Sequence, residues 1–393
     1  MILRFLRNFM RLTHAEIYLN NLKSNIKNIR SLLKPKTKIC AAVKANAYGN
    51  GAVRCAKAAV EAGASFLAVA TVSEGIELRN AGIETPVLLL SLCSPPEIED
   101  VVKYSITPLV FDKEFINLLD SEISQKQLTS KKFPVHLAVD SGMGRIGALP
   151  EDALSVARQI VQSDNLELGG MCTHFAVADS DLPEDIEYTE KQFSSFMSAV
   201  NSVQNAGINP GIRHCCNSPA TLNHPEWQLD MVRPGIIVYG YYPGKITKEY
   251  LLKKGLDFEL KPVMTLVSGV SAIRHFEKGK SVSYGCTWTA SKETDIAVIP
   301  VGYGDGFLRR FSKVVKPAIA GKEYSICGRI CMDQCMIDLG NESGVKRWDK
   351  VVLFGSKEAG AFISAQEIAD ATDTIPYEIM TGITARVERI YIE

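Results

Sequence analysis

The feature that most constrains the fold is an alternation of short apolar runs with amphipathic stretches, from about Ala15 to Gly255. The stretches carry apolar residues at the three- and four-residue spacing of a helix. Strands that alternate with helices imply parallel β-α-β units, and eight of them in about 240 residues fit a (β/α)8 barrel. The predicted strands are residues 39–43, 66–70, 87–90, 107–110, 135–139, 166–173, 212–215 and 232–239, and the clearest helical patterns are 53–62, 73–81, 151–161 and 189–206.

An open, doubly wound sheet has the same local pattern and is the main alternative. Such sheets usually stop at five to seven strands and carry a glycine-rich first turn. The chain has no G-x-x-x-x-G-K-[ST] motif, and its glycine cluster at 302–306 is too compact and too late for a dinucleotide fingerprint. We therefore expect the barrel.

After about Asp257 the pattern changes to short strand-like runs separated by Gly and Lys-Gly turns. Closely spaced strands with turn signals indicate a mainly β domain, in which helical pattern is nearly confined to residues 364–372. The expected organisation is an N-terminal extension (1–11), a barrel (12–254) and a mainly β C-terminal domain (255–393).

Charge and hydropathy exclude several classes of protein. The 393 residues carry 44 Lys and Arg against 44 Asp and Glu, so the formal net charge is zero and nucleic acid is not an expected partner. No run approaches eighteen apolar residues, which excludes a membrane span. The basic first twelve residues lack the apolar core of a secretion signal, so secretion is not expected.

The ten cysteines are scattered through apolar segments, which is typical of reduced thiols in a cytoplasmic protein. Cys327, Cys331 and Cys335 fall four apart, and Cys215 adjoins Cys216, but no second Cys or His pair completes a zinc site. In a strand, four-residue spacing puts three residues on one face. We expect buried structural thiols and no metal.

Candidate catalytic residues lie where the predicted strands end, because barrel enzymes build their sites at the C-terminal ends of their strands. Lys44 follows the first run directly, and a lysine beside a buried strand can lose its proton and serve as a base or form a Schiff base. Other polar residues follow later strands: Asp140, Arg145, His174, Asn217, Ser218 and Arg233.

Nine motifs in order and spacing resemble the pyridoxal-phosphate-dependent alanine racemases over residues 12–393. They are AVKANAYGNG, DSGMGRIG, THFAVAD, NSPATL, MVRPGI, VSYGCTWTA, GYGDGF, CGRICMDQ and IPYEI. The resemblance implies a fold of barrel plus β domain, pyridoxal phosphate as cofactor, and racemisation of L-alanine to D-alanine, a peptidoglycan precursor. The same alternation of strands and helices had already predicted the barrel.

The resemblance also assigns the reacting groups. Lys44 matches the lysine that binds the cofactor and then acts as one base, and Tyr284 matches the base on the opposite face. Inverting a carbon requires removal of a proton from one face and delivery to the other. His174 and Arg233 match residues hydrogen-bonded to this tyrosine, where a cation favours the phenolate. Arg233 also matches the residue that faces the pyridine nitrogen, where a guanidinium weakens the electron sink and discourages side reactions.

Further positions match residues that hold the cofactor or the substrate. Arg145 matches an arginine near the cofactor's phenolic oxygen and the substrate carboxylate, and Met332 matches a residue whose backbone N–H meets that carboxylate. Asp333 and Arg309 match residues of the corridor leading to the site. The positions that match the family's phosphate cup are Tyr48, Ser218, the backbone N–H groups of Gly235 and Ile236, and Tyr377. The cofactor-binding positions as a whole are Lys44, Tyr48, Arg145, His174, Asn217, Ser218, Arg233, Gly235, Ile236 and Tyr377.

Because Tyr284 and Met332 serve the partner subunit's site in this family, the resemblance implies a homodimer with shared active sites. The same architecture also suits a broad-spectrum or serine racemase, or a decarboxylase, which needs no second proton-transfer residue. A cofactor-carrying protein without turnover is a third reading. Such proteins are usually a lone barrel, so the complete β domain argues against it.

Three positions depart from the family pattern. Ala138 stands where many members have a carbamylated lysine, so we expect another anion, such as chloride, or a different hydrogen-bond partner to orient Arg145. Asn50 replaces a common histidine, and Trp288 replaces a usual tyrosine. The tryptophan is expected to change bulk near the site and not its chemistry.

Overall fold

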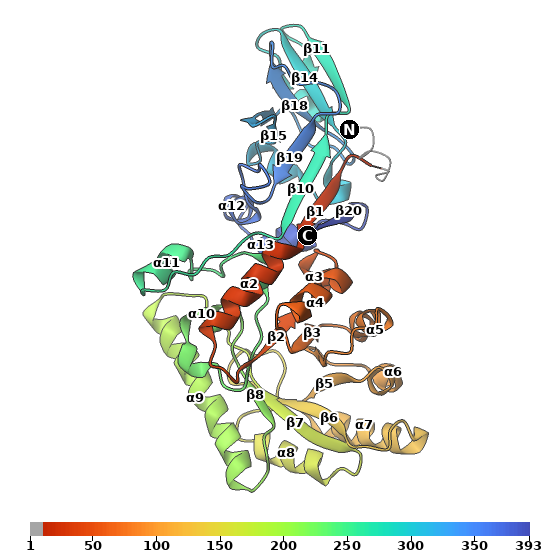
Figure 1. Ribbon diagram of the computed structural model, residues 1–393, viewed down its shortest axis with the longest axis vertical. Coiled ribbons are helices and arrows are strands. Elements are labelled where there is room, and N and C mark those ends of the chain that lie inside the picture. The colour runs from red at the N-terminus through yellow and green to blue at the C-terminus, as the bar shows by residue number, and fades with distance from the viewer. Residues whose placement is uncertain (1–10) are drawn as a thin grey trace. The chain divides into compact units, whose positions relative to one another are not determined.

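The computed structural model describes residues 11–393 and divides into two compact units (Figure 1). The barrel unit comprises residues 22–47 and 52–260, and the β unit comprises 261–393 together with residues up to 21 and the short segment 48–51. All but the last residue of the expected N-terminal extension lies outside the described residues. The two units are described separately.

The barrel unit is built on a parallel sheet in the order β8-β7-β6-β5-β4-β3-β2-β9. The two outermost strands meet through hydrogen bonds from Asp230 N–H to Arg213 O (3.1 Å) and from Arg233 N–H to Cys216 O (2.8 Å), which nearly close the ring. The expected barrel is thereby confirmed. Its strands are β2 (Lys38–Ala42), β3 (Phe66–Val69), β4 (Val87–Leu89), β5 (Ile106–Val110), β6 (Phe133–Ala138), β7 (Leu166–Cys172), β8 (Ile212–His214) and β9 (Met231–Val232).

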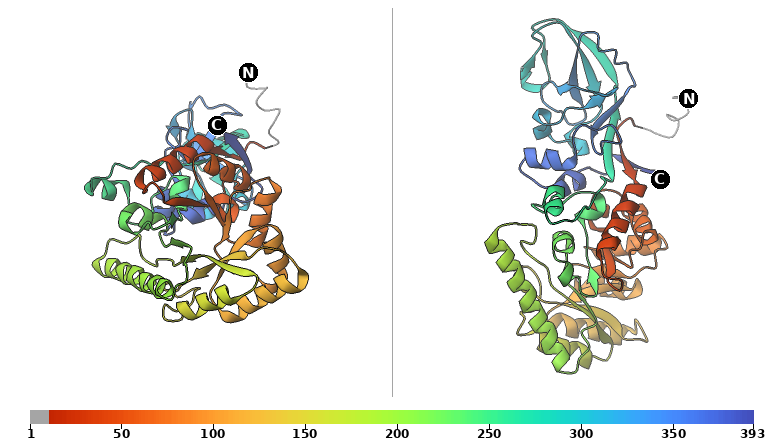
Figure 2. Two further views of the ribbon diagram at one scale, coloured as in Figure 1. Left: turned by 60° about the horizontal axis from the view of Figure 1, so that its bottom comes forward. Right: turned by 60° about the vertical axis from the view of Figure 1, so that its left-hand side comes forward.

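Helices surround these strands, as the left view of Figure 2 shows. Local capping explains where several begin: Asp112 accepts the Phe115 N–H at the start of α7, and Thr71 with Glu74 forms a capping box on α5. The helices are α2 (Leu19–Leu32), α4 (Ala52–Glu61), α5 (Val72–Asn80), α6 (Ile98–Lys103), α7 (Lys113–Lys126), α8 (Ala153–Gln162), α9 (Pro183–Asn205), α10 (Ser218–Asn223) and α11 (Lys248–Lys253), with 3-10 turns η2 (Pro95–Glu97), η3 (Pro225–Trp227) and η4 (Ile236–Tyr239).

The last barrel strand is shorter than the sequence predicts. The apolar run 232–239 was expected to be one strand, but β9 ends at Val232 and η4 takes the second half of the run. Pro234 lies between them and has no N–H to give to a sheet ladder, so the strand cannot continue. The buried apolar residues of η4 produced a strand-like pattern without a strand.

The β unit consists of three antiparallel or mixed sheets, drawn in Figure 2 in cyan to blue except for the first strand, β1, which is red. The largest has the order β16-β15-β19-β10-β1-β20, the second β11-β14-β18-β17, and the third pairs β12 with β13. The strands are β1 (His14–Tyr18), β10 (Met264–Gly269), β11 (Ala272–Phe276), β12 (Ser281–Val282), β13 (Trp288–Thr289), β14 (Thr294–Ile299), β15 (Ala318–Ile319), β16 (Lys322–Glu323), β17 (Ser325–Ile326), β18 (Cys335–Gly340), β19 (Lys350–Phe354) and β20 (Glu388–Ile392).

The start of the chain corrects the expected domain boundary. Sequence analysis placed residues 12–21 in the barrel, but β1 pairs antiparallel with β10 and parallel with β20 in the β unit. Both strands that pair with β1 come from segments far along the chain, so the local sequence pattern could not identify the sheet to which β1 belongs. The helix expected at 364–372 is α12 (Ala365–Ala371), and α13 (Pro376–Thr381) was not expected.

The cysteines are all free, but their burial is not uniform. Cys286 is exposed and Cys331 is half-buried, contrary to the expectation of buried thiols. Cys327 follows β17, Cys335 begins β18 and Cys331 lies in the turn between, so these three do not share one strand face. Among residues 11–393, no group of three His, Cys, Asp or Glu side chains is placed to hold a metal. No helix in the same range is long and apolar enough to cross a membrane.

Candidate active site

The C-terminal ends of the barrel strands enclose a cavity of about 360 Å³. Lys44 enters it just after β2, and Arg145, His174 and Arg233 enter from the segments after β6, β7 and β9. Four of the polar residues predicted from the sequence therefore come together. The remaining lining residues are Ala70, Leu90, Ser91, Leu109, Ala138, Val139, Met143, Ile146, Cys172 and Thr173.

The cavity has a basic lining. Lys44, Arg145 and Arg233 contribute three basic groups, and no carboxylate is among the residues that line it. Burial and then the positive charge of Arg145 lower the pKa of Lys44, with Glu74 acting in the opposite direction. Both effects favour the neutral amine, which is the nucleophilic and basic form. The cavity therefore suits an anionic ligand with an electrophilic carbon near Lys44.

The backbone after Lys44 makes a left-handed turn. Ala45, Asn46, Ala47 and Tyr48 all have φ of 52–53°. Residues with a Cβ pay about 1–2 kcal/mol each for this conformation. The turn is held by the Ala45 N–H on Glu74 Oε1 (2.6 Å), the Ala47 N–H on Val43 O (2.8 Å) and the Ala52 N–H on Asn46 Oδ1 (2.8 Å).

Strained backbone that the surroundings over-determine is typical of functional sites. Here it reverses the chain immediately after β2 and leaves Lys44 at the mouth of the strand. The sequence offered no sign of this turn, because neither Gly nor Asn-Gly stands at its first three positions.

Arg233 is 6% exposed and is held by acceptors at the end of β8 and just after β7. Its Nη1 lies 2.8 Å from His214 Nδ1 and 2.9 Å from His214 O, and its Nη2 lies 2.8 Å from Thr173 O and 3.3 Å from His174 Nδ1. A guanidinium can only donate, so both Nδ1 atoms must accept. His174 and His214 are therefore neutral, with their protons on Nε2.

The pKa values agree with this assignment. Burial, and then the charge of Arg233, lowers the pKa of His174 to about 3. The same two causes move the pKa of His214 well below its ordinary value. Each ring is thus a neutral hydrogen-bond donor at Nε2 near pH 7.

The network continues into the barrel interior. His214 Nε2 lies 2.8 Å from His136 Nδ1, so the His214 N–H donates to His136. Burial and then Arg233 lower the pKa of His136 to about 3. Gly170 makes room for this ring, because a Cβ there would lie 2.7 Å from His136 Cε1. Both histidines lie within barrel strands, and no local pattern in the sequence predicts their link to Arg233.

The loop carrying Arg145 is shaped by Asp140. Its carboxylate accepts the N–H groups of Gly142 (3.0 Å), Gly144 (3.0 Å) and Arg145 (3.2 Å), and the Tyr188 hydroxyl donates to Gly142 O (2.7 Å). Partial burial raises the pKa of Asp140, but these N–H donors together outweigh it and leave the pKa below its ordinary value. Asp140 is thus a positioning residue, and Ala138 at the end of β6 is buried in the cavity wall.

The predicted phosphate-binding residues belong to both units. In the barrel unit, Asn217 caps α10, and the Gly235 N–H donates to Ser218 Oγ (2.8 Å) just before η4 with Ile236. In the β unit, the rings of Tyr48 and Tyr377 lie 5.7 Å apart. Burial raises the pKa of Tyr48 to about 12, so its hydroxyl remains a donor. Ser218, Gly235 and Ile236 therefore lie close together in the barrel unit, and Tyr48 and Tyr377 lie close together in the β unit.

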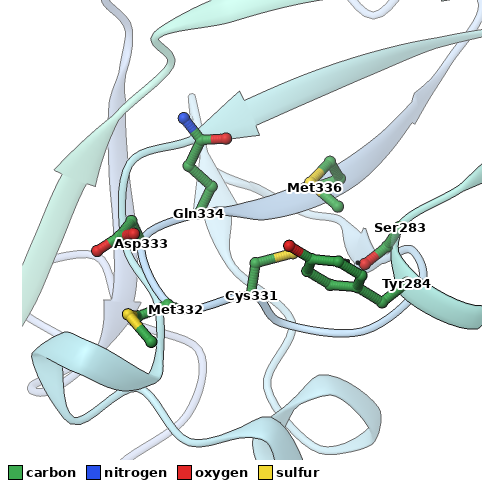
Figure 3. A pocket seen from close by; sticks show the side chains of 7 residues that line it. All are labelled: Ser283, Tyr284, Cys331, Met332, Asp333, Gln334 and Met336. Atoms are coloured by element: carbon green, nitrogen blue, oxygen red, sulfur yellow. Dashed lines mark hydrogen bonds between the residues drawn. The ribbon is translucent and has the colours of Figure 1, made fainter.

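The β unit has a second pocket, of about 510 Å³, shown in Figure 3. It is lined by Tyr284, whose side chain is 71% exposed, and Met332, which is 52% exposed. Tyr284 and Ser283 lie at one side of this pocket, and Met332 and Asp333 lie together at the other side (Figure 3). The other lining residues are Ser283, Gln334 and Met336.

The remaining predicted positions also lie in the β unit. Arg309 begins the exposed 3-10 turn η7 (Arg309–Lys313) and Asn50 is fully buried. Trp288 packs against Val282, Ile296 and Cys327, so its ring belongs to a hydrophobic cluster of this unit.

Two family models match the chain. The model of the alanine racemase N-terminal domain matches residues 17–243, and that of the alanine racemase C-terminal domain matches residues 263–391.

Full-length relatives agree with the family models. An alanine racemase from Treponema denticola is 49% identical over 386 residues, which cover 98% of this chain and 99% of the relative. An alanine racemase from Desulforamulus reducens is 43% identical over 380 residues, which cover 96% of this chain and 98% of the relative. The match therefore extends over both units.

Solved structures agree with the sequence comparisons. Alanine racemase from Clostridium difficile 630 superposes with a TM-score of 0.90 at 38% identity and covers 98% of this chain and 97% of that one. Alanine racemase from Bacillus anthracis with bound L-Ala-P has a TM-score of 0.88 at 36% identity, and the match covers 98% of this chain and 96% of that one.

Proposed function

Because the chain belongs to the alanine racemase family, whose members are isomerases, we propose that it interconverts L- and D-alanine with pyridoxal phosphate. The observation that carries the proposal is the cavity where Lys44, with its lowered pKa, lies among basic groups and no carboxylate. When bound there, the cofactor withdraws electrons from the substrate's α-carbon and makes its proton acidic. The cofactor's phosphate and the substrate's carboxylate are both anions, which this lining suits.

Lys44 and Tyr284 are proposed as the two bases. Lys44 Nζ would hold the cofactor through its aldehyde carbon and, as a free amine, would move the α-proton on one face. Tyr284 Oη moves the proton on the other face. The exposed phenol of Tyr284 is available to a site beyond its own pocket.

The proposed support for Tyr284 comes from Arg233 and His174. Since the guanidinium forces His174 Nδ1 to accept, His174 Nε2 must carry a proton. A neutral imidazole N–H can donate to a phenolate and stabilise it without losing its own proton. Arg233 has only donors, so it would not stabilise a protonated pyridine nitrogen and would weaken the cofactor's withdrawal of electrons, which would discourage side reactions.

The anionic ends of cofactor and substrate are proposed to bind separately. Tyr48, Tyr377, Ser218 and the N–H groups of Gly235 and Ile236 hold the phosphate, and Asn217 caps the helix that carries Ser218. Arg145 approaches the phenolic oxygen and the substrate carboxylate. Met332 N–H meets the same carboxylate, and Asp333 with Arg309 lines the corridor. A small anion such as chloride is proposed to orient Arg145 beside Ala138.

A homodimer with shared sites is the proposed assembly, in which Tyr284 and Met332 serve the partner subunit. Two large side chains exposed around one pocket are typical of an interaction surface. The free thiols and neutral composition support a cytoplasmic location, where D-alanine would supply peptidoglycan synthesis.

The experiment that tests this function uses the purified protein with its natural cofactor. Borohydride reduction followed by peptide mass mapping should place one pyridoxyl group on Lys44, and polarimetry should show both directions of alanine racemisation. A protein with no visible cofactor absorption, or with the label on another lysine, would contradict the assignment.

Substrate breadth is tested by the same assay on L-alanine, L-serine and L-lysine. Serine differs from alanine by one hydroxyl, and apolar pockets reject such an analogue only about 100-fold. We expect alanine to be fastest, serine slow and lysine inactive. Equal rates would favour a broad-spectrum racemase, and carbon dioxide release from lysine would favour a decarboxylase.

A further inference from the structure

The glycine cluster 302–306 does not line either pocket, yet it holds one of them. The N–H groups of Tyr303 and Gly304 donate to the carbonyls of Cys331 (3.0 Å) and Met332 (2.9 Å). A Cβ at Gly302 would lie 2.2 Å from Cys331 O, so only glycine permits this approach. The cluster thus forms a backbone cradle for the turn that carries Met332.

Within residues 11–393, the turn leaves the backbone donor of Met332 free. Cys331 N–H closes it on Gln334 O (2.8 Å), and the cradle takes up the carbonyls of Cys331 and Met332. Among the described residues, the N–H of Met332 has no hydrogen-bond partner. Met332 lines the same pocket as Tyr284 (Figure 3), and an open backbone N–H is suited to an anion.

Asp333, the next residue, would oppose such an anion. Its carboxylate is 59% exposed and adds a negative charge next to the free N–H. Arg386 Nη2 lies 2.7 Å from Asp333 Oδ1 and neutralises that charge. The same guanidinium lies, through Nε, 3.5 Å from Oδ1 of Asp305, whose side chain is fully buried.

Asp305 is anchored from three sides. Arg11 binds both its oxygens (2.5 and 2.8 Å), the Gly302 N–H donates to it (3.1 Å), and Arg386 is its second cation. A buried carboxylate requires such pairing, and it holds a fixed position because it is paired. The chain of contacts therefore runs from Arg11 through Asp305 and Arg386 to Asp333.

We propose that Asp305, held by Arg11, positions Arg386, and that Arg386 draws aside and neutralises Asp333, so that the Met332 turn presents an N–H and no net negative charge to the substrate carboxylate. Arg386 and Asp305 are thus positioning residues for substrate binding. The inference rests on the proposed function, in which the Met332 N–H meets that carboxylate.

Arg386→Gln tests the inference directly. Asp333 is then unpaired beside the carboxylate site, and we expect KM for L-alanine to rise about tenfold, which is a plausible effect of one like charge near a protein surface. The turnover number should change less than about twofold, because neither proton-transfer group is touched. The dissociation constant of propionate, a substrate carboxylate without its amine, should rise by the same factor, while the cofactor's absorption spectrum stays unchanged.

The double variant Arg386→Gln/Asp333→Asn separates charge from structure. If the defect is the unpaired Asp333 charge, removing that charge restores KM and propionate binding to within about threefold of the original. A merely structural role for Arg386 would leave the double variant as impaired as the single one. Arg386→Lys keeps the charge and should recover most of the affinity.

Gly304→Ala crowds Arg386 most and removes no charge, since a Cβ there would lie 2.3 Å from Arg386 Nη1, the end of a flexible side chain, and 3.1 Å from Met332 O. This variant should raise both KM for L-alanine and the dissociation constant of propionate. Arg274→Gln, on the exposed strand β11, is the charge-matched control and should leave them unchanged.

Unchanged constants in both Arg386→Gln and Gly304→Ala would overturn the inference. The proposed function would still stand if the unaltered protein racemises alanine. An unaltered protein without racemisation or cofactor absorption would overturn the proposed function itself, so the two failures are distinguishable.

Discussion

The two pockets differ in what holds their functional groups. In the barrel cavity, Arg233 is held by buried acceptors and in turn fixes the tautomers of His174 and His214, while burial lowers the pKa of Lys44. In the β unit, Tyr284 and Met332 are exposed, and the Met332 turn is held by backbone hydrogen bonds on a glycine cradle. The first pocket is specified by electrostatics and the second by the shape of a turn. Substitutions should therefore damage the two in different ways.

The largest expected effect comes from Lys44→Ala. It removes the group that holds the cofactor and one of the two bases, so both the visible absorption and the racemase activity should be lost. Absorbance and polarimetry on the same sample measure this. Retention of the visible band in Lys44→Ala would mean that another amine carries the cofactor.

Tyr284→Phe should affect only one of these readouts. Loss of one acid–base group lowers the rate by about 10²- to 10⁴-fold, while the cofactor, bound through Lys44, should keep its absorption. Steady-state rates from L- and D-alanine measure the loss. An unchanged rate in either direction would end the two-base account.

The buried histidines should make stability depend on pH. The folded pKa of His136, about 3, lies below its unfolded value of 6.5, so the unfolded state binds the proton more readily. The contribution is present above pH 6.5 and is lost as pH falls, by about 1.4 kcal/mol per pH unit. His136→Gln should reduce this slope between pH 6.5 and about 5, where ordinary carboxylates remain ionised. Urea unfolding at several pH values measures it.

His275 on the β unit is the matched contrast. Hydrogen bonds to Asp295 and Glu293 raise its pKa, so its contribution is present below pH 6.5 and is lost as pH rises. His275→Gln should therefore change the slope in the opposite sense, and weakly, because the group is exposed. If both variants changed the pH dependence of the free energy of unfolding in the same sense, the electrostatic contrast between the two units would be contradicted.

The smallest effect compares two capping boxes. Glu74 caps α5 and also holds the strained turn after Lys44, whereas Glu367 caps α12 in the β unit. Each Glu→Ala variant should lose about 1 kcal/mol of stability in thermal or urea unfolding. Only Glu74→Ala should also weaken cofactor retention, measured by dialysis and absorbance, because only it releases the Ala45 N–H. Equal retention in both would show that the left-handed turn does not depend on Glu74.

Much of the fold follows from local pattern. Seven of the eight predicted barrel strands, such as 66–70 and 166–173, match β3 and β7 to within about two residues, since burial on both faces leaves a continuous apolar run. The eighth failed after Val232, where apolar residues pack in a 3-10 turn. β1 was assigned to the wrong unit because its partners β10 and β20 lie more than 240 residues away.

The candidate site divides in the same way. Strand-end position alone selected Lys44, Arg145, His174 and Arg233, which the fold brings to one cavity. Nothing local marked His214 as the partner of Arg233, or Asp305 as the anchor of Arg386. These pairings join residues 19 and 81 positions apart, and a sequence pattern carries no information about which polar groups meet in the interior.

The sequence by itself determined the barrel, the following β domain, the family and the candidates for the reactive side chains, because periodicity and motif spacing are local properties of the chain. Only the tertiary structure decided the protonation of those side chains and the direction of their donors. A histidine's tautomer depends on what faces each nitrogen, and a turn's free N–H depends on which carbonyls its neighbours have claimed. Both are settled by contacts between distant segments, here at Arg233 and at Met332.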